Sequence, residues 1–300
     1  MKKIALALLV TTAMTGAALA DAHAIKEFNI GILGGENAQD RLTSTECLRV
    51  KTEALLGVPV KVFTPADYDG VIQGLLGGTI DFAWLGASAY AKTYLTDPEA
   101  VDVMLTKQNI DGSTGYYSIG FARKDSGITT MEDAKGKTFA FADPNSTSGY
   151  LVPAAELQAS FGKLEEYFAE VKFSGGHEQS IVGVHNGDFE AGVSWADGLG
   201  NWEDGYTSGA FRKAADSGLV DMNNLVEIWK SKLIPEGPIV IRRTIPQDIK
   251  DKMYAMMDTM WADDKECAYN TAAGEAMDFV PVKHEDYLGI IEARKLQEAQ

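Results

Sequence analysis

The chain is short of positive charge. Its 300 residues include 27 lysines and arginines against 43 aspartates and glutamates, which gives a formal net charge of -16. Because such a surface repels a phosphate backbone, we expect no nucleic-acid partner. An anionic small molecule is still compatible with this charge, but backbone dipoles and hydrogen bonds must then hold it against the overall field.

Several motifs of catalysis and metal binding are missing. No spacing typical of a metal site links the four histidines, His23, His177, His185 and His284. There is no G-x-x-x-x-G-K-[ST] nucleotide loop and no G-x-S-x-G nucleophile elbow. We therefore expect neither metal nor cofactor. An enzyme would require Ser146, His177 and Asp197 to act as nucleophile, base and orienting acid.

Long apolar runs are missing after the first 24 residues. Residues 1–24 begin with Lys2 and Lys3 and continue with an apolar run shorter than the ~20 residues of a membrane span. They end in two small-residue cleavage patterns, Ala18-Leu19-Ala20 and Ala22-His23-Ala24. We interpret residues 1–24 as a secretory signal peptide, cleaved near Asp21 or Ile25, and expect a periplasmic protein without a membrane span.

Cysteine is scarce as well. The chain has only Cys47 and Cys267. In an oxidising compartment this pair can form one disulfide that joins an early helix to the C-terminal region. Two separate buried thiols are the alternative, because the sequence does not show whether the Cα atoms come within the roughly 7 Å that a bridge requires.

The chain contains a weak internal repeat at a constant offset. Residues 28–33 align with 137–142, and residues 71–81 align with 180–190. In each copy a strand leads into a polar turn, and a later helix ends at a glycine before a strand that carries an acid. Both halves therefore follow the order strand, helix, strand, helix, strand, which predicts two lobes, each a parallel sheet covered by helices.

The repeat also predicts where a ligand binds. In an open parallel sheet, ligands lie beyond the carboxyl ends of the strands. Tyr68 and His177 follow one pair of equivalent strands, and Ser88 and Asp197 follow another. We expect all four to face one crevice between the lobes.

Other segments are assigned by their patterns. Residues 116–123 and 238–242 are expected to carry the chain between the lobes. The tail from Pro246 onward has methionines at helical spacing and is expected to pack on the first lobe. Residues 197–221, rich in glycine and aspartate, are expected to form a decorated loop of the second lobe.

The strongest local signal for a ligand is the stretch Asp-Pro-Asn-Ser-Thr-Ser-Gly at 143–149, between a strand and a helix expected to begin near Gly149. A helix start offers unpaired N–H groups and partial positive charge. Ser146, Thr147 and Ser148 add hydroxyl groups there, so the stretch suits a tetrahedral oxyanion. Simple N-capping is the alternative for these residues, and the two roles are compatible.

Three more side chains are expected near this loop. His177 follows two glycines at a second helix start, where it can donate a hydrogen bond to an oxyanion. Tyr68 and Tyr116 would close the site from the first lobe and the hinge. The alternative for each tyrosine is a core position with a bonded hydroxyl.

These stretches closely resemble the periplasmic phosphonate-binding proteins of ABC importers. The resemblance rests on residues 143–149, on residues 67–74 and on Gly176-His177-Glu178, and it covers most of residues 28–242. It implies the α/β fold of type II periplasmic binding proteins, with two lobes and a hinge of two crossing strands. Lobe 1 would then comprise residues 25–115 and 239–300, and lobe 2 residues 116–238.

The resemblance also implies roles for individual residues. Ser146, Thr147 and Ser148 would donate to the phosphonate oxygens, with help from Tyr68, Tyr116 and His177. Relatives that bind 2-aminoethylphosphonate hold its ammonium group with two acids. At those positions this chain has Asp197, which is shorter than glutamate, and Gly237, which has an acid only next to it at Glu236. Trp195 is expected either to narrow the pocket or to be a core residue.

We therefore predict a solute-binding protein rather than an enzyme. It would capture 2-aminoethylphosphonate or a smaller alkylphosphonate and deliver it to an ABC permease. The alternatives are a phosphite- or phosphate-binding protein of the same fold and a secreted hydrolase of phosphoesters or phosphonates.

Overall fold

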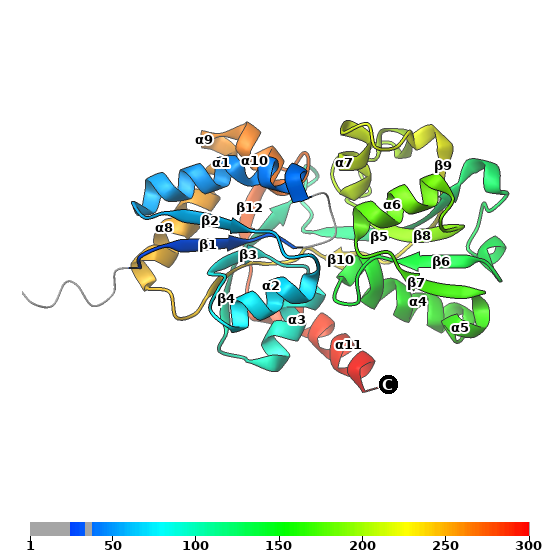
Figure 1. Cartoon of the computed structure of the whole chain (residues 1–300), viewed down its shortest axis with the longest axis horizontal. Helices are drawn as coiled ribbons and strands as arrows, with labels where there is room; N and C mark the ends of the chain where they lie inside the picture. Colours follow the sequence, from blue (N-terminus) through cyan, green and yellow to red (C-terminus); the bar gives the residue numbers. More distant parts are fainter. Residues whose placement is uncertain (1–24, 34–37, 300) are drawn as a thin grey trace, which may run out of the picture.

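The computed structural model of the chain describes residues 25–33 and 38–299. The signal peptide predicted for residues 1–24 and the turn predicted at 34–37 lie outside the described residues. Two α/β lobes lie side by side, each built on one six-stranded sheet (Figure 1). Within the described part of the chain, no helix has the length and apolar character of a membrane span.

The first lobe has a mixed sheet with helices on both faces. Its strands, in spatial order, are β12 (Asp278–Pro281), β4 (Val101–Gln108), β11 (Ile239–Arg242), β3 (Phe82–Trp84), β1 (Phe28–Gly31) and β2 (Val60–Phe63). The strand β1 is parallel to β2 and β3, whereas β11 is antiparallel to β3 and β4. Its helices are α1 (Ala38–Leu56), α2 (Tyr68–Leu76), α3 (Ala87–Thr96), α8 (Gln247–Asp258), α9 (Met260–Asp263), α10 (Lys265–Ala272) and α11 (Leu288–Glu298).

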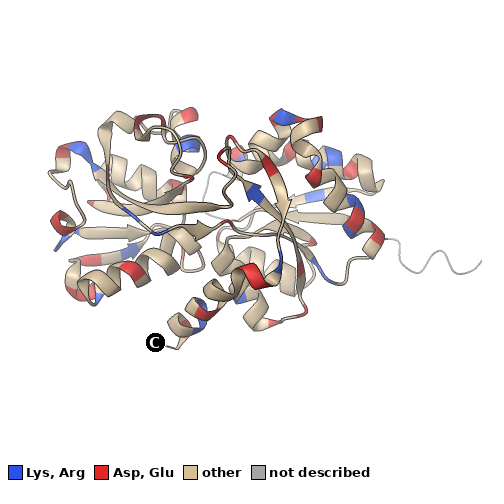
Figure 2. Ribbon diagram, turned by 180° about the vertical axis from the view of Figure 1, so that it is seen from behind, with Lys and Arg blue, Asp and Glu red and all other residues tan. Residues whose placement is uncertain are grey.

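The second lobe repeats this plan with fewer helices. Its strands run in the order β10 (Ile234–Pro235), β5 (Gly115–Arg123), β8 (Ala191–Ala196), β6 (Thr138–Phe141) and β7 (Glu170–Phe173), and β9 (Leu225–Lys230) also pairs with β5. Its helices are α4 (Val152–Phe161), α5 (Leu164–Tyr167), α6 (His177–Asn186) and α7 (Ala210–Asp216). Figure 2 shows acidic and basic residues mixed over the outer helices of both lobes, without a basic face in that view.

The predicted repeat corresponds to a shared topology. The strand β1 lies between β2 and β3 as β6 lies between β7 and β8, all in parallel pairs. The equivalent helices α2 and α6 are followed by the glycines Gly77 and Gly187. Each copy then has an antiparallel strand beside β3 or β8, namely β11 or β5. The prediction of two α/β lobes of like topology is confirmed.

The segments between the lobes are shorter than predicted. Strand β5 pairs only within the second sheet and β11 only within the first. The chain therefore passes between the sheets in two links, residues 109–114 and residues 236–238. The second link runs tightly against the turn before α3, because a Cβ added at Gly237 would lie 1.9 Å from the carbonyl oxygen of Leu85. The lobe boundaries given above stay a prediction.

The C-terminal tail packs on the first lobe, as predicted. Met253 and Met257 of α8 and Met260 of α9 are buried in its core together with Phe28 and Phe279. The same tail contains β12, a four-residue strand that the helical pattern did not reveal.

The expectation of an irregular loop over residues 197–221 is partly wrong. The helix α7 lies within this region, and its Phe211 is fully buried. Seven residues are too few to show a helical period among the surrounding glycines and aspartates.

The two cysteines form a disulfide. Cys47 of α1 and Cys267 of α10 are bonded, with their Cα atoms 5.7 Å apart. This settles the choice between a bridge and two thiols. The bond fixes the first helix of the lobe to the C-terminal tail, which returns to the first lobe only after the whole second lobe has been traversed.

We expect the disulfide to contribute about 2–4 kcal/mol to the free energy of unfolding, because it closes a loop with a sequence separation of 220 residues. Urea unfolding with and without a reductant measures this contribution. The Cys47→Ser/Cys267→Ser variant is the control and should not respond to the reductant. Equal unfolding midpoints for the oxidised and reduced native protein would contradict the expectation.

Candidate functional site

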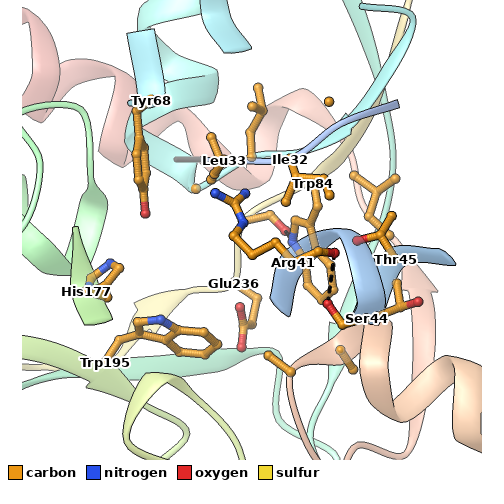
Figure 3. A pocket seen from close by; sticks show the side chains of 18 of the residues that line it. Ile32, Leu33, Arg41, Ser44, Thr45, Tyr68, Trp84, His177, Trp195 and Glu236 are labelled. Atoms are coloured by element: carbon orange, nitrogen blue, oxygen red, sulfur yellow. Dashed lines mark hydrogen bonds between the residues drawn. The ribbon is translucent and has the colours of Figure 1, made fainter. Parts of the chain in front are cut away.

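A cavity of about 210 Å³ lies between the lobes. Its walls include all the predicted binding residues except Asp197, namely Tyr68, Tyr116, Ser146, Thr147, Ser148 and His177. Figure 3 shows Tyr68 and Arg41 facing His177 and Trp195 across this space, with Glu236 beside Trp195. The carboxyl ends of β1, β3, β6 and β8 surround the cavity, as expected for parallel sheets.

The serine-rich loop forms the second-lobe wall of the cavity. After β6, residues Thr147–Leu151 form a π-helical turn that leads into α4. Ser146 caps this turn, since its Oγ accepts a hydrogen bond from the Gly149 N–H at 2.9 Å. The same Oγ lies 3.0 Å from His177 Nε2, and His177 Nδ1 lies 3.3 Å from Ser194 Oγ. Ser146 therefore caps a helix and also lines the cavity.

The next residue leaves its backbone donor open. Thr147 and Ser148 are each about 1% exposed. No acceptor among the described residues pairs with the Thr147 N–H group, whereas the Ser148 N–H group interacts with the Tyr116 hydroxyl. Thr147 Oγ1 accepts from Ser88 N–H at 2.9 Å, and the Ser148 carbonyl accepts from Ser118 Oγ at 2.7 Å. Buried N–H groups without acceptors are costly, so this turn is arranged to receive an acceptor from a ligand.

Buried polar contacts hold this loop from behind. Asp143 accepts from the Asn145 N–H at 2.7 Å and from the Tyr68 N–H at 3.4 Å, and burial raises the pKa of its carboxyl group. Arg294 of α11 is about 5% exposed and reaches across from the first lobe. Its guanidinium donates to the Pro144 carbonyl at 3.0 Å and to Asn145 Oδ1 at 2.8 Å. The Pro144–Asn145 peptide is thus held on both its C=O and its N–H side.

Ser88 and Asp197 are not among the residues that line this cavity, and the expectation that both face the crevice stays a prediction. The Ser88 hydroxyl accepts from Arg294 at 3.3 Å, behind the loop. The Asp197 carboxylate accepts from the Thr207 hydroxyl and from the Leu199 N–H at 3.1 Å. Both side chains are buried and serve the loops around them.

Glu236 is the acidic side chain that does reach the cavity. It is about 6% exposed and lies on the second link between the lobes. Burial, followed by the negative charge of Glu236, raises the pKa of Tyr116, so its hydroxyl remains protonated as a donor. Trp195 also lines the cavity and packs edge-to-face on Tyr116, with ring centroids 5.5 Å apart. In the sequence, the only sign that Glu236 belongs to the site was its position beside Gly237.

An acidic side chain, as found at this position in the aminoethylphosphonate binders, would not fit at Gly237 without a shift of the backbone. Its Cα faces the backbone of Leu85 and Gly86 directly. Its carbonyl accepts from Trp84 Nε1 and from Thr106 Oγ1, each at 2.8 Å. The link is therefore fixed to the first lobe at this residue, and no side chain fits.

The three residues of the enzymatic alternative are not joined in one hydrogen-bonded chain. His177 Nδ1 lies 3.3 Å from the Ser194 hydroxyl, whereas the Asp197 carboxylate accepts from Thr207. Among the described residues, no cluster of histidine, cysteine and acidic side chains would hold a metal ion. The groups that line the cavity are backbone N–H groups, hydroxyl groups, the His177 imidazole and the basic side chains of Arg41 and Lys213.

Two α/β lobes with such an interlobe site define a periplasmic solute-binding protein of the type II fold. Residues 36–287 match the family model described as the periplasmic substrate-binding protein of the ABC phosphonate transporter. The chain belongs to this family, and the resemblance found in the sequence is confirmed.

Individual relatives of the chain have names that are consistent with this family. The phosphonates-binding periplasmic protein of Escherichia coli is 33% identical over 248 residues, which cover 79% of this chain and 68% of that protein. The phosphate-import protein PhnD of Mycolicibacterium smegmatis is 28% identical over 242 residues, 78% of this chain and 71% of that protein. The crystal structure of a phosphonate-transporter binding protein from Pseudomonas aeruginosa has a TM-score of 0.78 at 26% identity and covers 91% of this chain and 86% of that one.

The fold is shared with a more distant solved structure. PhnD1 of Prochlorococcus marinus, in complex with methylphosphonate, has a TM-score of 0.77 at 19% identity, and the match covers 91% of this chain and 99% of that one.

We expect Arg294→Met to favour the open form of the protein, because its hydrogen bonds to Pro144 and Asn145 join the lobes. Small-angle X-ray scattering without ligand should give a larger radius of gyration for this variant than for the native protein. Arg49→Met is the matched control, since Arg49 pairs with Glu46 and Glu53 on the surface of α1. Identical scattering from all three proteins would show that Arg294 does not hold the lobes together.

Proposed function

We propose that the protein captures a phosphonate in the interlobe cavity and delivers it to the permease of an ABC transporter. The open N–H group of Thr147 carries this proposal, because it is a buried donor without an acceptor among the described residues. A phosphonate offers several acceptor oxygens and a negative charge, which the start of a helix stabilises.

Each predicted donor has a place in this scheme. The N–H and hydroxyl groups of Thr147 and Ser148 take the phosphonate oxygens from one side, with the Ser146 hydroxyl and His177 beside them. Tyr68 belongs to the first lobe and Tyr116 begins the second, so the ligand bridges the lobes. A bridging anion favours the closed form over the open one. Closure by hinge rotation would let a permease recognise the loaded protein.

The rest of the cavity favours a small substituent on phosphorus. Beyond the donors the walls include the apolar side chains of Leu33, Trp84 and Trp195. Since Asp197 bonds to its own loop, Glu236 is the one acid among the described residues that line the cavity. A smaller alkylphosphonate therefore fits better than 2-aminoethylphosphonate, whose ammonium group requires acids. Methylphosphonate, the ligand of the Prochlorococcus structure, is of this size.

Binding of phosphate or phosphite is the second candidate function. One relative is named a phosphate-import protein. Another, from Prochlorococcus marinus, is named a probable phosphite-binding protein and is 26% identical over 145 residues. The donors around Thr147 would serve these anions too. A bare tetrahedral anion leaves the apolar walls without a contact, so phosphonate is preferred.

We expect isothermal titration calorimetry to rank methylphosphonate above phosphite and phosphate by about tenfold or more, because the apolar walls contact only a substituent. Heat from none of the three anions would end the proposal. A clear preference for phosphate would replace it with the second candidate.

We expect Ser146→Ala and His177→Ala each to weaken the binding of all three anions by about tenfold, because each removes one charge-assisted hydrogen bond. Lys92→Met, which removes a surface ion pair between α3 and Asp69, is the control and should bind normally. Phosphorus NMR of the same mixtures should return every ligand unchanged, since a hydrolase would produce new signals.

A further inference from the structure

Glu236 and Lys107 form a buried ion pair at the edge of the cavity. Their side chains are about 6% and 0% exposed, and Lys107 Nζ lies 3.0 Å from Glu236 Oε1. Only Glu236 lines the cavity, because Lys107 of β4 lies behind it. Glu236 is also the one acid among the described residues that line this space.

Lys107 is held from several directions. Its Nζ donates to Ser208 Oγ in the second lobe at 2.9 Å. It also lies 5.4 Å from the ring centre of Trp195. A fully buried lysine with these contacts has no route to water, so its positive charge stays beside Glu236 and Trp195.

The ion pair leaves an acceptor open. Glu236 Oε1 lies beside Lys107 and is fully buried, whereas Glu236 Oε2 is not buried to the same extent and accepts no hydrogen bond within the described part of the chain. The pair therefore cancels most of its charge at a distance, while Oε2 can still accept from a donor in the cavity. Without Lys107, the Glu236 carboxylate would repel a phosphonate dianion in the same cavity.

A ligand ammonium group would be poorly placed here. It would meet the Glu236 oxygen with the Lys107 charge directly behind, and like charges in a buried site oppose each other strongly. The other predicted acid, Asp197, is engaged with Thr207, and position 237 admits no side chain. A hydroxyl group, in contrast, donates one hydrogen bond and adds no charge.

We propose that the Glu236–Lys107 pair makes this protein selective for phosphonates with a small uncharged, hydroxyl-bearing substituent over those with an ammonium group. This inference rests on the proposed function and names its substrate class. The phosphonate group would occupy the Thr147 loop, and the substituent hydroxyl would donate to Glu236 Oε2 beside Trp195.

Calorimetry with three ligands that share the ethylphosphonate skeleton tests the proposal in the native protein. We expect 2-hydroxyethylphosphonate to bind about tenfold more tightly than ethylphosphonate, the effect of one hydrogen bond to a buried carboxylate. We expect 2-aminoethylphosphonate to bind no more tightly than ethylphosphonate. Tighter binding of the amine than of the alcohol would overturn the inference and leave phosphonate binding intact. Absence of binding by all three would overturn the proposed function as well.

Two variants test the roles of the paired residues. Lys107→Met removes the positive charge and should shift the preference by about tenfold toward 2-aminoethylphosphonate, because Glu236 then acts alone. Glu236→Gln should reduce the preference for the alcohol over ethylphosphonate. Lys250→Met is the matched control, since Lys250 pairs with Asp102 away from the cavity and should leave the ranking unchanged. An unchanged ranking in a folded Lys107→Met variant would overturn the role of the pair. If that variant does not fold, the ranking in the native protein decides.

Discussion

The buried N–H group of Thr147 is the constraint on which the site depends. A helix must start at this loop, yet this donor has no acceptor within the described part of the chain. Its cost is tolerated because the flanking groups are hydrogen-bonded: Ser146 caps Gly149, Asp143 holds Asn145, and Arg294 holds the Pro144 carbonyl. The loop is therefore rigid before a ligand arrives, and little ordering is required on binding.

Hydrogen bonds between the lobes make the site depend on both of them. Tyr68 and Ser88 of the first lobe donate their backbone N–H groups to Asp143 and Thr147 of the second. Lys107 of the first lobe bonds to Ser208 of the second. The residues that would bind the anion therefore also hold the lobes together. An anion between the lobes would add its own contacts to these hydrogen bonds.

Much of this organisation could be predicted from sequence, since it follows from periodic patterns and from the polar residues that come after the strand ends. The repeat placed Tyr68 and His177 opposite each other, and the serine-rich stretch identified the anion loop. The sequence could not show that Asp197 turns to Thr207, because that depends on the conformation of a glycine-rich loop. It also could not pair Glu236 with Lys107, because these residues meet only when β4 and the second link pack together. The sequence could not decide whether the two cysteines are bonded for the same reason, because the distance between two remote helices depends on tertiary structure.

The tight passage of Gly237 along the backbone of Leu85 has an evolutionary consequence. No single substitution there can introduce an acid, because even a methyl group would collide with a main-chain oxygen. A descendant of this protein that came to use amines would first have to rebuild the turn before α3 or give up Lys107.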